Sequence, residues 1–308
     1  MPYNIVYVDE PTYIDTAFVS ELAKRGTVEL HFDRPSPLEL RRRLASADIA
    51  ISEWSRFTAE SIPTDGRLKH IALLLSAWDA VDLTAASQAG VTVSNCPDYC
   101  IDAVSDYVVA CAYALARCLP AASRAGIAGI AHLYTPFLGR ELNGTTIGLI
   151  GVGRIGQAIA KRAHGIGMRV VGCNRSGNLA PGVELMPMDQ VIAESDMISI
   201  QLPYNIETHG ILDGHLLSKA KRDSLWVNVG RFNLFCESSL EEVVRERRIA
   251  GIALDDCSYR MADVLRSHPN AIVTPGTAWY TVQSRQRNLE ELIKKIDGLR
   301  LGDSDASS

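Results

Sequence analysis

Gly151-Val152-Gly153-Arg154-Ile155-Gly156 is the stretch of sequence that decides the fold. It follows an apolar run typical of a buried strand, 146–150, and precedes a run typical of a helix, 157–165. In such a turn the first glycine permits the tight bend, the second lets a pyrophosphate approach the backbone, and the third lets the helix pack on the strand. The N–H groups at the helix start favour an anion. The pattern therefore predicts that Gly151, Gly153, Arg154, Ile155 and Gly156 bind a dinucleotide cofactor.

The strand expected after this turn leads into Asn174-Arg175-Ser176. In dinucleotide-binding folds a carboxylate at about this distance, roughly 20 residues on, binds the ribose 2′-hydroxyl of NAD. Here there is no carboxylate; instead an arginine attracts a 2′-phosphate, and a serine can donate a hydrogen bond to it. These three residues are therefore predicted to bind the ribose end of the cofactor. They favour NADP(H), while NAD(H) stays possible.

Short apolar runs alternate with helical patterns along the chain, which predicts an α/β fold with parallel sheets. In the first part, strands are expected at 5–8, 28–32, 48–52, 70–76 and 91–94. A second series is expected at 146–150, 169–172, 197–201, 225–228, 251–254 and 271–274. Among the helices expected between and after them are 16–25, 38–45, 82–88, 101–118 and 282–299.

The composition excludes several classes of protein. The chain has 308 residues, 47% of them hydrophobic, which is enough for two domains with a core each. Its net charge of −5 argues against nucleic-acid binding, which needs a basic surface. We expect a cytoplasmic protein that does not bind membranes, because no apolar run reaches about 18 residues and the N-terminus has no signal-peptide pattern. The seven cysteines, without a Cys-x-x-Cys pair, argue against a disulfide framework and a metal site.

Further motifs accompany the glycine turn along nearly the whole chain. In chain order they are 90–97 (GVTVSNCP), Val104-Ser105-Asp106, the glycine turn with 167–170 (GMRV), Gln201-Leu202-Pro203 with Thr208 and Ile211, 227–231 (VNVGR), Ala253-Leu254-Asp255 and 274–280 (TPGTAWY). Together these motifs resemble the D-isomer-specific 2-hydroxyacid dehydrogenase family. The Asp106 variant and the Ala-Trp-Tyr ending are similar to the branch of the C-terminal-binding-protein corepressors.

The resemblance implies two α/β domains with an active site in the cleft between them. A flavodoxin-like substrate domain would comprise residues 1–99 and 281–308, and a Rossmann-type dinucleotide-binding domain residues 100–280. It also implies a homodimer formed through the nucleotide domain, with which the apolar stretch 101–118 is consistent. Beyond the glycine turn, the cofactor contacts that it implies are Leu202, Pro203, Thr208, Val229, Gly230, Arg231, Asp255, Gly276 and Ala278.

Members of this family transfer a hydride between a nicotinamide cofactor and a 2-keto or 2-hydroxy acid. Arg231 matches the arginine that grips the substrate's carboxylate and carbonyl, and it is the predicted catalytic residue. The histidine that protonates the alkoxide falls on Gly276, and the glutamate that pairs with that histidine, five residues beyond Asp255, falls on Arg260. Because glycine has no proton to donate, both members of the family's proton relay are missing here.

The predicted substrate contacts also depart from the family pattern. The loop that usually is rich in glycine reads Leu75-Ser76-Ala77. Its main-chain N–H groups can still meet a carboxylate, although side chains restrict φ where glycine would not. Gly276 would enlarge the pocket, and Trp279 and Tyr280 are expected to line it, Trp279 as an apolar or stacking wall. We therefore expect a small-molecule substrate that bears a carboxylate.

Three functions fit these residues. The first is an NAD(P)H-dependent oxidoreductase that reduces a protonated imine or an activated alkene, because neither leaves an alkoxide; the alkene would take its proton later from water or Tyr280. The second is an ordinary 2-hydroxyacid dehydrogenase with a substitute acid, such as Tyr280, Tyr259 or a bound water. The third is a non-catalytic dinucleotide-binding sensor or scaffold. The first is favoured, because the cofactor turn and Arg231 are kept while the acid is lost.

Overall fold

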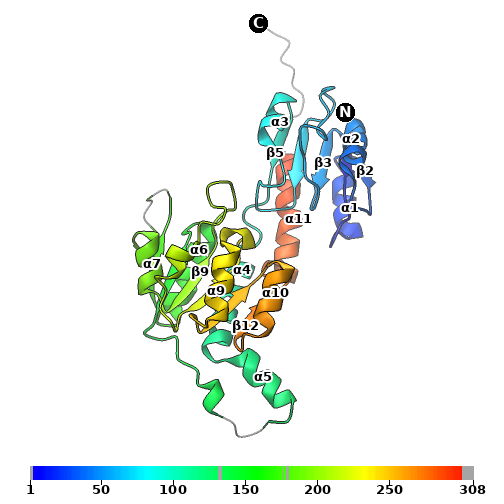
Figure 1. Cartoon of the computed structure of the whole chain (residues 1–308). Helices are drawn as coiled ribbons and strands as arrows, with labels where there is room; N and C mark the ends of the chain where they lie inside the picture. The colour runs from blue at the N-terminus through cyan, green and yellow to red at the C-terminus, as the bar shows by residue number, and fades with distance from the viewer. Residues whose placement is uncertain (1–2, 131–133, 176, 178–179, 300–308) are drawn as a thin grey trace. The chain divides into compact units, whose positions relative to one another are not determined.

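The computed structural model describes residues 3–130, 134–175, 177 and 180–299. The chain forms two compact units, one made of Met1–Cys100 with Thr281–Ser308 and the other of Ile101–Tyr280. Figure 1 follows the chain through both units by colour. Each unit is built on a parallel sheet, so the α/β class predicted from the alternating pattern is confirmed.

The first unit has a five-stranded sheet in the order β2-β1-β3-β4-β5. This is the strand order of flavodoxin-like folds, which confirms the expectation for this part of the chain. Its strands are β1 (Tyr3–Tyr7), β2 (Gly26–Leu30), β3 (Ile49–Ser52), β4 (His70–Leu73) and β5 (Thr92–Ser94). Its helices are α1 (Thr16–Ala23), α2 (Pro37–Ser46), α3 (Leu83–Gln88) and α11 (Val282–Asp297).

Polar side chains fix where the helices of the first unit begin and how the last one attaches. The caps of α1, α2 and α3 each accept a hydrogen bond from the N–H three residues on; they are Asp15, Ser36 and Asp82. Far along the chain, α11 joins this unit through Asn288, which is fully buried. Its Nδ2 donates to the Leu74 carbonyl, directly after β4, at 3.1 Å. Helix α11 is therefore an integral part of the first unit although it ends the described chain.

The second unit has a seven-stranded sheet in the order β12-β11-β10-β9-β6-β7-β8. Because β6 lies between β7 and β9, the strand order reverses there, and the expected Rossmann-type fold is confirmed. The strands are β6 (Thr146–Ile150), β7 (Arg169–Cys173), β8 (Glu184–Leu185), β9 (Met197–Ile200), β10 (Leu225–Asn228), β11 (Gly251–Leu254) and β12 (Ala271–Val273). The helices are α4 (Ile101–Ala116), α5 (Leu119–Ile127), α6 (Arg154–Gly165), α7 (Met188–Glu194), α8 (Gly214–Leu217), α9 (Glu237–Arg245) and α10 (Tyr259–Arg266), with short 3₁₀ turns η1 (Thr135–Phe137) and η2 (Phe232–Leu234).

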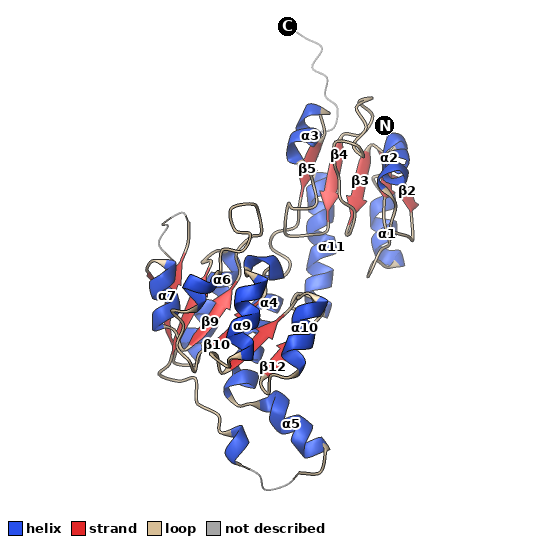
Figure 2. Ribbon diagram, in the orientation of Figure 1, coloured by secondary structure: helices blue, strands red, loops and turns tan. Residues whose placement is uncertain are grey.

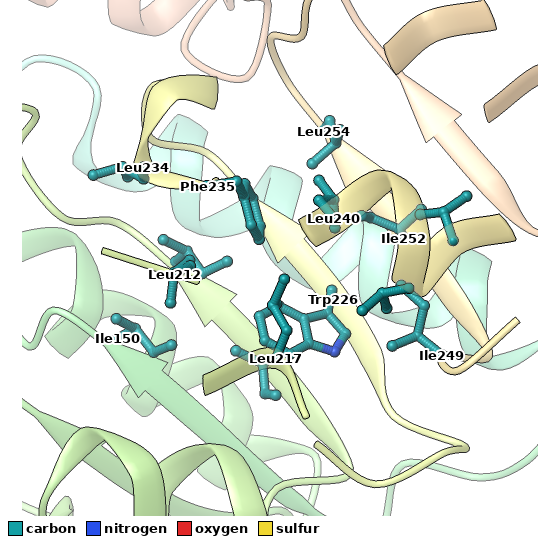
Figure 3. Close-up of a cluster of buried hydrophobic side chains, with 14 of the residues drawn as sticks. Ile150, Leu212, Leu217, Trp226, Leu234, Phe235, Leu240, Ile249, Ile252 and Leu254 are labelled. Atoms are coloured by element: carbon teal, nitrogen blue, oxygen red, sulfur yellow. The ribbon is translucent and has the colours of Figure 1, made fainter. Parts of the chain in front are cut away.

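Alternate residues of this sheet face two separate cores. On one face, Ile150, Trp226 and Leu254 pack among side chains from α7, α8, α9 and α10, as Figure 3 shows for part of the cluster. On the other face, Leu149 and Val227 pack against α4 and α6. The strands are therefore buried on both sides, which is why they read as continuous apolar runs in the sequence.

The helix expected over 101–118 is α4, which ends at Ala116, and a separate helix, α5, follows from Leu119. Between the two helices Cys118 has a left-handed φ of 52°, and Pro120 lies in the first turn of α5. Helix α4 packs against α6, β10 and β11 of its own unit. By contrast, α5 has no buried residue and extends away from the sheet of its unit in Figure 2. Several large apolar side chains on α5 and the segment after it are therefore exposed.

Candidate functional site

The predicted cofactor residues lie at one edge of the seven-stranded sheet, where its parallel strands end. In spatial order this edge carries the turn 274–278 after β12, Asp255 after β11, 229–231 after β10, 201–203 after β9, 151–156 after β6 and 174–175 after β7. Ligands of doubly wound folds bind at this edge, next to the point where the strand order reverses. Residues far apart in the sequence are thus brought to a common edge by the topology.

Each glycine of the turn 151–156 has its own structural reason. Gly151 has a φ of 101°, which favours glycine. A Cβ on Gly156 would lie 2.5 Å from the carbonyl oxygen of Gly151, so α6 packs this closely only without a side chain there. A Cβ on Gly153 would meet nothing within 4 Å, so this position faces open space. Gly153 is also the N-cap of α6, and it has no side chain with which to cap the helix start.

Gln201 fixes the glycine turn to the end of β9. Its Nε2 donates to the carbonyl oxygens of Gly151 at 2.7 Å and Ile150 at 3.2 Å, and its Oε1 accepts from Ser199 Oγ at 2.8 Å. These partners set the orientation of the amide, since carbonyl oxygens only accept and the hydroxyl proton is donated. The sequence places Gln201 in a motif but does not mark it as a site residue. Its position at a strand end beside the glycine turn is the signal that could have identified it.

Asn174 and Arg175 follow β7, where the sequence predicts the ribose contacts. Asn174 Oδ1 accepts a hydrogen bond from the N–H of Gly177 at 2.8 Å. Arg175 is exposed, and its Nη1 lies 3.1 Å from Glu207 Oε2 on the loop after β9. An exposed ion pair of this kind contributes little to stability, so a stronger anion can replace the carboxylate. Ser176, the third predicted residue of this group, lies outside the described residues.

The loops after β9 and β10 contact each other beside the glycine turn. Thr208 fixes the first loop, because its hydroxyl donates to the Pro203 carbonyl at 2.8 Å. A Cβ on Gly230 would lie 3.2 Å from the carbonyl oxygen of Leu202, so a side chain there would press the two loops apart slightly. Val229 is held between them by its N–H, which donates to the Ile200 carbonyl at 3.1 Å.

Arg231 directly follows this contact and begins η2. Its backbone is ordinary extended chain, with φ −66° and ψ 141°, and the residue is exposed. The turn before it is shaped by Asn228, which is fully buried. Asn228 Oδ1 accepts from the Gly230 N–H at 3.1 Å, and its Nδ2 donates to the Gly230 carbonyl at 3.3 Å. Arg231 therefore stands on a turn that a buried amide holds in shape, with its side chain outside the core.

The turn 274–278 is held by the buried Asp255. Its Oδ1 accepts from Thr274 Oγ1 at 2.6 Å and from the Thr277 N–H at 2.8 Å, and both carboxylate oxygens accept from the Ala278 N–H. Burial raises the pKa of Asp255, while these hydrogen bonds act in the opposite direction. The N–H of Gly276 donates to the main-chain carbonyl of Asp255. Asp255 therefore positions this turn with both its side chain and its backbone.

The middle of the same turn offers space rather than a functional group. Gly276 has a φ of 75°, and a Cβ there would have only the Asp255 carbonyl within 4 Å, at 3.9 Å. Arg260 lies on α10 and forms an ion pair with Glu241 at the surface of the unit. Trp279 and Tyr280 pack edge to face, with ring centroids 5.1 Å apart. Trp279 is half-buried and Tyr280 is 42% exposed, so neither ring belongs to the core.

In the first unit, Leu75, Ser76 and Ala77 form the loop after β4, at the carboxyl edge of that sheet. The Leu75 carbonyl accepts from the Cys96 N–H, and the Ser76 carbonyl accepts from Asn95 Nδ2 at 2.7 Å. None of the three loop residues has a positive φ, so the loop conformation does not require glycine. Within the described part of the chain, their N–H groups form no hydrogen bond. Three successive donors are thus available to an anion.

Three histidines and one tyrosine of the second unit can be located among the described residues as possible replacements for the expected acid. His164 contacts the Gly182 carbonyl, His209 contacts the Tyr204 hydroxyl at 3.1 Å, and His268 precedes β12, at the end opposite to the turn 274–278. Tyr259, a candidate acid, is 97% exposed at the start of α10. His132 lies outside the described residues. The described residues include no group of three His, Cys, Asp or Glu side chains that could hold a metal ion, and no described helix has the length and apolar character to cross a membrane.

A doubly wound sheet with this glycine turn, in one chain with a flavodoxin-like unit, defines an NAD(P)-dependent oxidoreductase. The comparison with family models is specific: residues 109–278, more than half of the chain, match the model described as D-isomer specific 2-hydroxyacid dehydrogenase, NAD binding domain. The protein belongs to the D-isomer specific 2-hydroxyacid dehydrogenase family.

Individual relatives cover nearly the whole chain. A glyoxylate reductase from Thermococcus onnurineus is 31% identical over 86% of this chain and 83% of its own length. A glycerate dehydrogenase from Methylorubrum extorquens is 27% identical over 87% of each. Among solved structures, an acyclic imino acid reductase in complex with NADPH and D-Arg is 36% identical, covers 96% of both chains and superposes with a TM-score of 0.91. The D-lactate dehydrogenase from Aquifex aeolicus, at 23% identity and a TM-score of 0.85, shares the fold.

Proposed function

We propose that this protein is an NADPH-preferring reductase of 2-imino acids, which carry a C=N bond next to a carboxylate. The observation that carries the proposal is the turn 274–278, which Asp255 holds firmly and which has Gly276 at its centre. In the family resemblance this is the position of the proton-donating histidine. Arg260, at the position of the paired glutamate, is engaged with Glu241 instead. The two replacements together remove the relay rather than retune its pKa.

The chemistry of the two possible substrates differs in the proton that reduction requires. The cofactor, when bound, supplies a hydride to the carbon of the C=N or C=O bond. A keto acid then becomes an alkoxide that must be protonated, and Gly276 has no group to do so. A protonated imine already carries that proton on nitrogen and becomes a neutral amine. The loss of the acid therefore penalises keto-acid reduction and leaves imine reduction intact.

The similarity to a solved acyclic imino acid reductase supports this proposal, because that protein is bound to NADPH and to D-Arg, a 2-amino acid. We expect a 2-amino acid as the product here as well. Arg231 would bind the substrate carboxylate through a charge-assisted, bidentate contact. The N–H groups of Leu75, Ser76 and Ala77 are a second proposed contact for a carboxylate. Trp279 and Tyr280 would pack against the substrate's side chain in the space that Gly276 leaves.

The proposed preference for NADPH rests on Arg175. We expect Arg175→Ala to weaken NADPH binding about tenfold, because one exposed charge-assisted hydrogen bond to the 2′-phosphate is lost. Glu207→Gln should act in the opposite direction and strengthen NADPH binding, since Glu207 competes with that phosphate for Arg175. NADH, which has no 2′-phosphate, serves as the matched control for both variants. Dissociation constants from fluorescence titration decide the matter: equal changes for NADPH and NADH would contradict the assignment.

We further propose a homodimer formed through the second unit. Its supporting feature is the exposed apolar surface on and after α5, which lies beyond the apolar stretch 101–118 that the sequence makes consistent with a dimer. The large exposed side chains there are Leu119, Ile127, Ile130, Tyr134 and Leu138. A patch of this kind marks an interface more often than a free surface. Light scattering tests the mass in solution, and Ile127→Asp should shift it toward the monomer.

The proposed activity is tested by following NADPH oxidation with 2-keto acids in the presence and absence of an amine. Ammonium or methylamine forms the 2-imino acid in equilibrium with the keto acid, so the two mixtures differ only in the C=N species. Straight-chain, aromatic and guanidinium-bearing keto acids cover the range of side chains. We expect oxidation that depends on the amine. Equal rates with the keto acid alone would favour an ordinary dehydrogenase, and no oxidation in any mixture would favour a sensor.

A further inference from the structure

Tyr107 on α4, directly after the Val104-Ser105-Asp106 motif but not part of it, contacts the turn 274–278. Its hydroxyl lies 2.6 Å from Thr274 Oγ1, and Thr274 Oγ1 lies 2.6 Å from Asp255 Oδ1. The direction of these hydrogen bonds follows from the final acceptor, the Asp255 carboxylate. An ionised carboxylate only accepts, so Thr274 uses its one hydroxyl proton on Asp255 and accepts from Tyr107. The chain of donors therefore runs from α4 to the buried carboxylate.

The side chain and the main chain of Asp255 both help to shape the turn 274–278. The N–H of Thr274 donates to the Leu254 carbonyl, that of Gly276 to the Asp255 carbonyl, and those of Thr277 and Ala278 to the Asp255 side chain. Pro275 has no N–H. Each N–H in the turn is thus directed at residues 254 and 255, and two of them depend on the charge state of a single side chain.

We propose that Tyr107 and Thr274 are positioning residues for the cofactor: their hydrogen bonds keep the Asp255 carboxylate ionised and oriented so that it holds the turn 274–278. The inference rests on the proposed location of the nicotinamide end of the cofactor beside this turn. It does not depend on which substrate is reduced. Neither Tyr107 nor Thr274 would touch the cofactor; both would act through Asp255.

Because Tyr107 and Thr274 act on the charge state of Asp255, their role can be detected as a pH dependence of cofactor affinity. Burial raises its pKa, and the hydrogen bonds from Thr274 and the two turn amides lower it. The titratable groups around it are Tyr107 and Cys111 on α4 and Asp256 beside it. Burial raises the pKa of Tyr107 above its usual range and that of Cys111 to about 11, so both stay neutral near neutral pH and below. Protonation of Asp255 would weaken the hydrogen bonds that hold the turn, so cofactor affinity should fall as the pH drops through the pKa of Asp255.

The test is the dissociation constant of NAD⁺ measured by calorimetry from pH 4.5 to 8. NAD⁺ is chosen because its pyrophosphate keeps the same charge over this range, whereas a 2′-phosphate titrates near a pKa of about 6. Thr274→Val removes the hydroxyl without changing the shape of the side chain. It should move the acid limb of binding upward by about one pH unit, since a hydrogen bond to the charged form is lost. Tyr107→Phe should move it in the same direction by less.

Two further variants separate this role from a merely structural one. Tyr113→Phe, on the same helix but 42% exposed, should leave the pH profile unchanged. Asp255→Asn should bind weakly at every pH and lose the acid limb, because its amide does not titrate. An acid limb that persists in Asp255→Asn would overturn the proposal. So would a Tyr107→Phe profile equal to the wild type, or one weakened equally at every pH. The titration contains NAD⁺ and no substrate, so these outcomes are independent of whether the protein reduces imines.

Discussion

Arg231→Gln is expected to lower kcat/KM by at least about 100-fold. The guanidinium would hold the substrate carboxylate through two charge-assisted hydrogen bonds, each of which contributes about 1.5–3 kcal/mol. Their loss therefore exceeds the 2.7 kcal/mol or so that corresponds to a factor of about 100. Because the carboxylate is bound in the ground state as well as in the transition state, much of the loss should appear as a higher KM. Steady-state kinetics with an amine and a keto acid at saturating NADPH measure it.

The fold should tolerate this substitution. Arg231 has an ordinary extended backbone and is exposed, so Arg231→Gln should keep the wild-type melting temperature. Arg231→Lys should fall between the two, because lysine keeps the charge without the planar fork. Arg266→Gln is the matched control, since Arg266 is an equally charged residue paired with Asp263 on the outside of α10. A kcat/KM in Arg231→Gln within a few-fold of this control would remove Arg231 from the site.

Gly153→Ala is expected to lower NADPH affinity by at least about 100-fold while leaving the protein folded. The backbone of Gly153 is extended, with φ −92° and ψ −156°, and an added Cβ would meet no protein atom within 4 Å. The methyl group would instead occupy the space in which we place the pyrophosphate. Displacing that group from two N–H donors would remove about 3 kcal/mol or more. Isothermal calorimetry gives the affinity, and thermal unfolding checks the fold.

Two other glycines of α6 provide the contrast. Gly156→Ala should lose both affinity and stability, because its Cβ would lie 2.5 Å from the Gly151 carbonyl oxygen and α6 would have to move. Gly165→Ala, at the last residue of the same helix, meets nothing within 4 Å and should bind NADPH normally with unchanged or slightly higher stability. If Gly153→Ala bound NADPH as tightly as Gly165→Ala, the pyrophosphate would not lie at this turn.

The sequence predicts the strands of the second unit well because they are buried on both faces. The bounds of β6, β10 and β11 coincide with the apolar runs expected at 146–150, 225–228 and 251–254. The helix break at Cys118 is different. A left-handed φ at a residue other than glycine leaves no mark in the sequence, so the helix expected over 101–118 runs past the observed end of α4 at Ala116, and α5 is not expected at all. A strand that is buried on both faces can be recognised from a single sequence, whereas an unusual backbone conformation at one residue cannot.

The site residues also fall into two groups, those whose roles can be predicted from the sequence and those whose roles need the tertiary fold. The roles of Gly151 and Gly156 depend on local backbone geometry, and the pattern of glycines alone predicts them. The roles of Gln201 and Tyr107 depend on which strand lies beside β6 and where α4 packs on the sheet. Both are set by the tertiary fold. Likewise, Arg175 is recognisable as a phosphate contact from its position, but its competing partner on the loop after β9 is visible only in the structure.

The most direct test of the proposed imine reduction is the identity of the product. The protein is incubated with NADPH deuterated at C4, a 2-keto acid and ammonium, and the products are separated and weighed by mass spectrometry. We expect a 2-amino acid that carries one deuterium on C2, because the hydride is transferred to the C=N carbon and Gly276 supplies no proton for an alkoxide. A deuterated 2-hydroxy acid as the main product would contradict imine reduction as the activity of this protein.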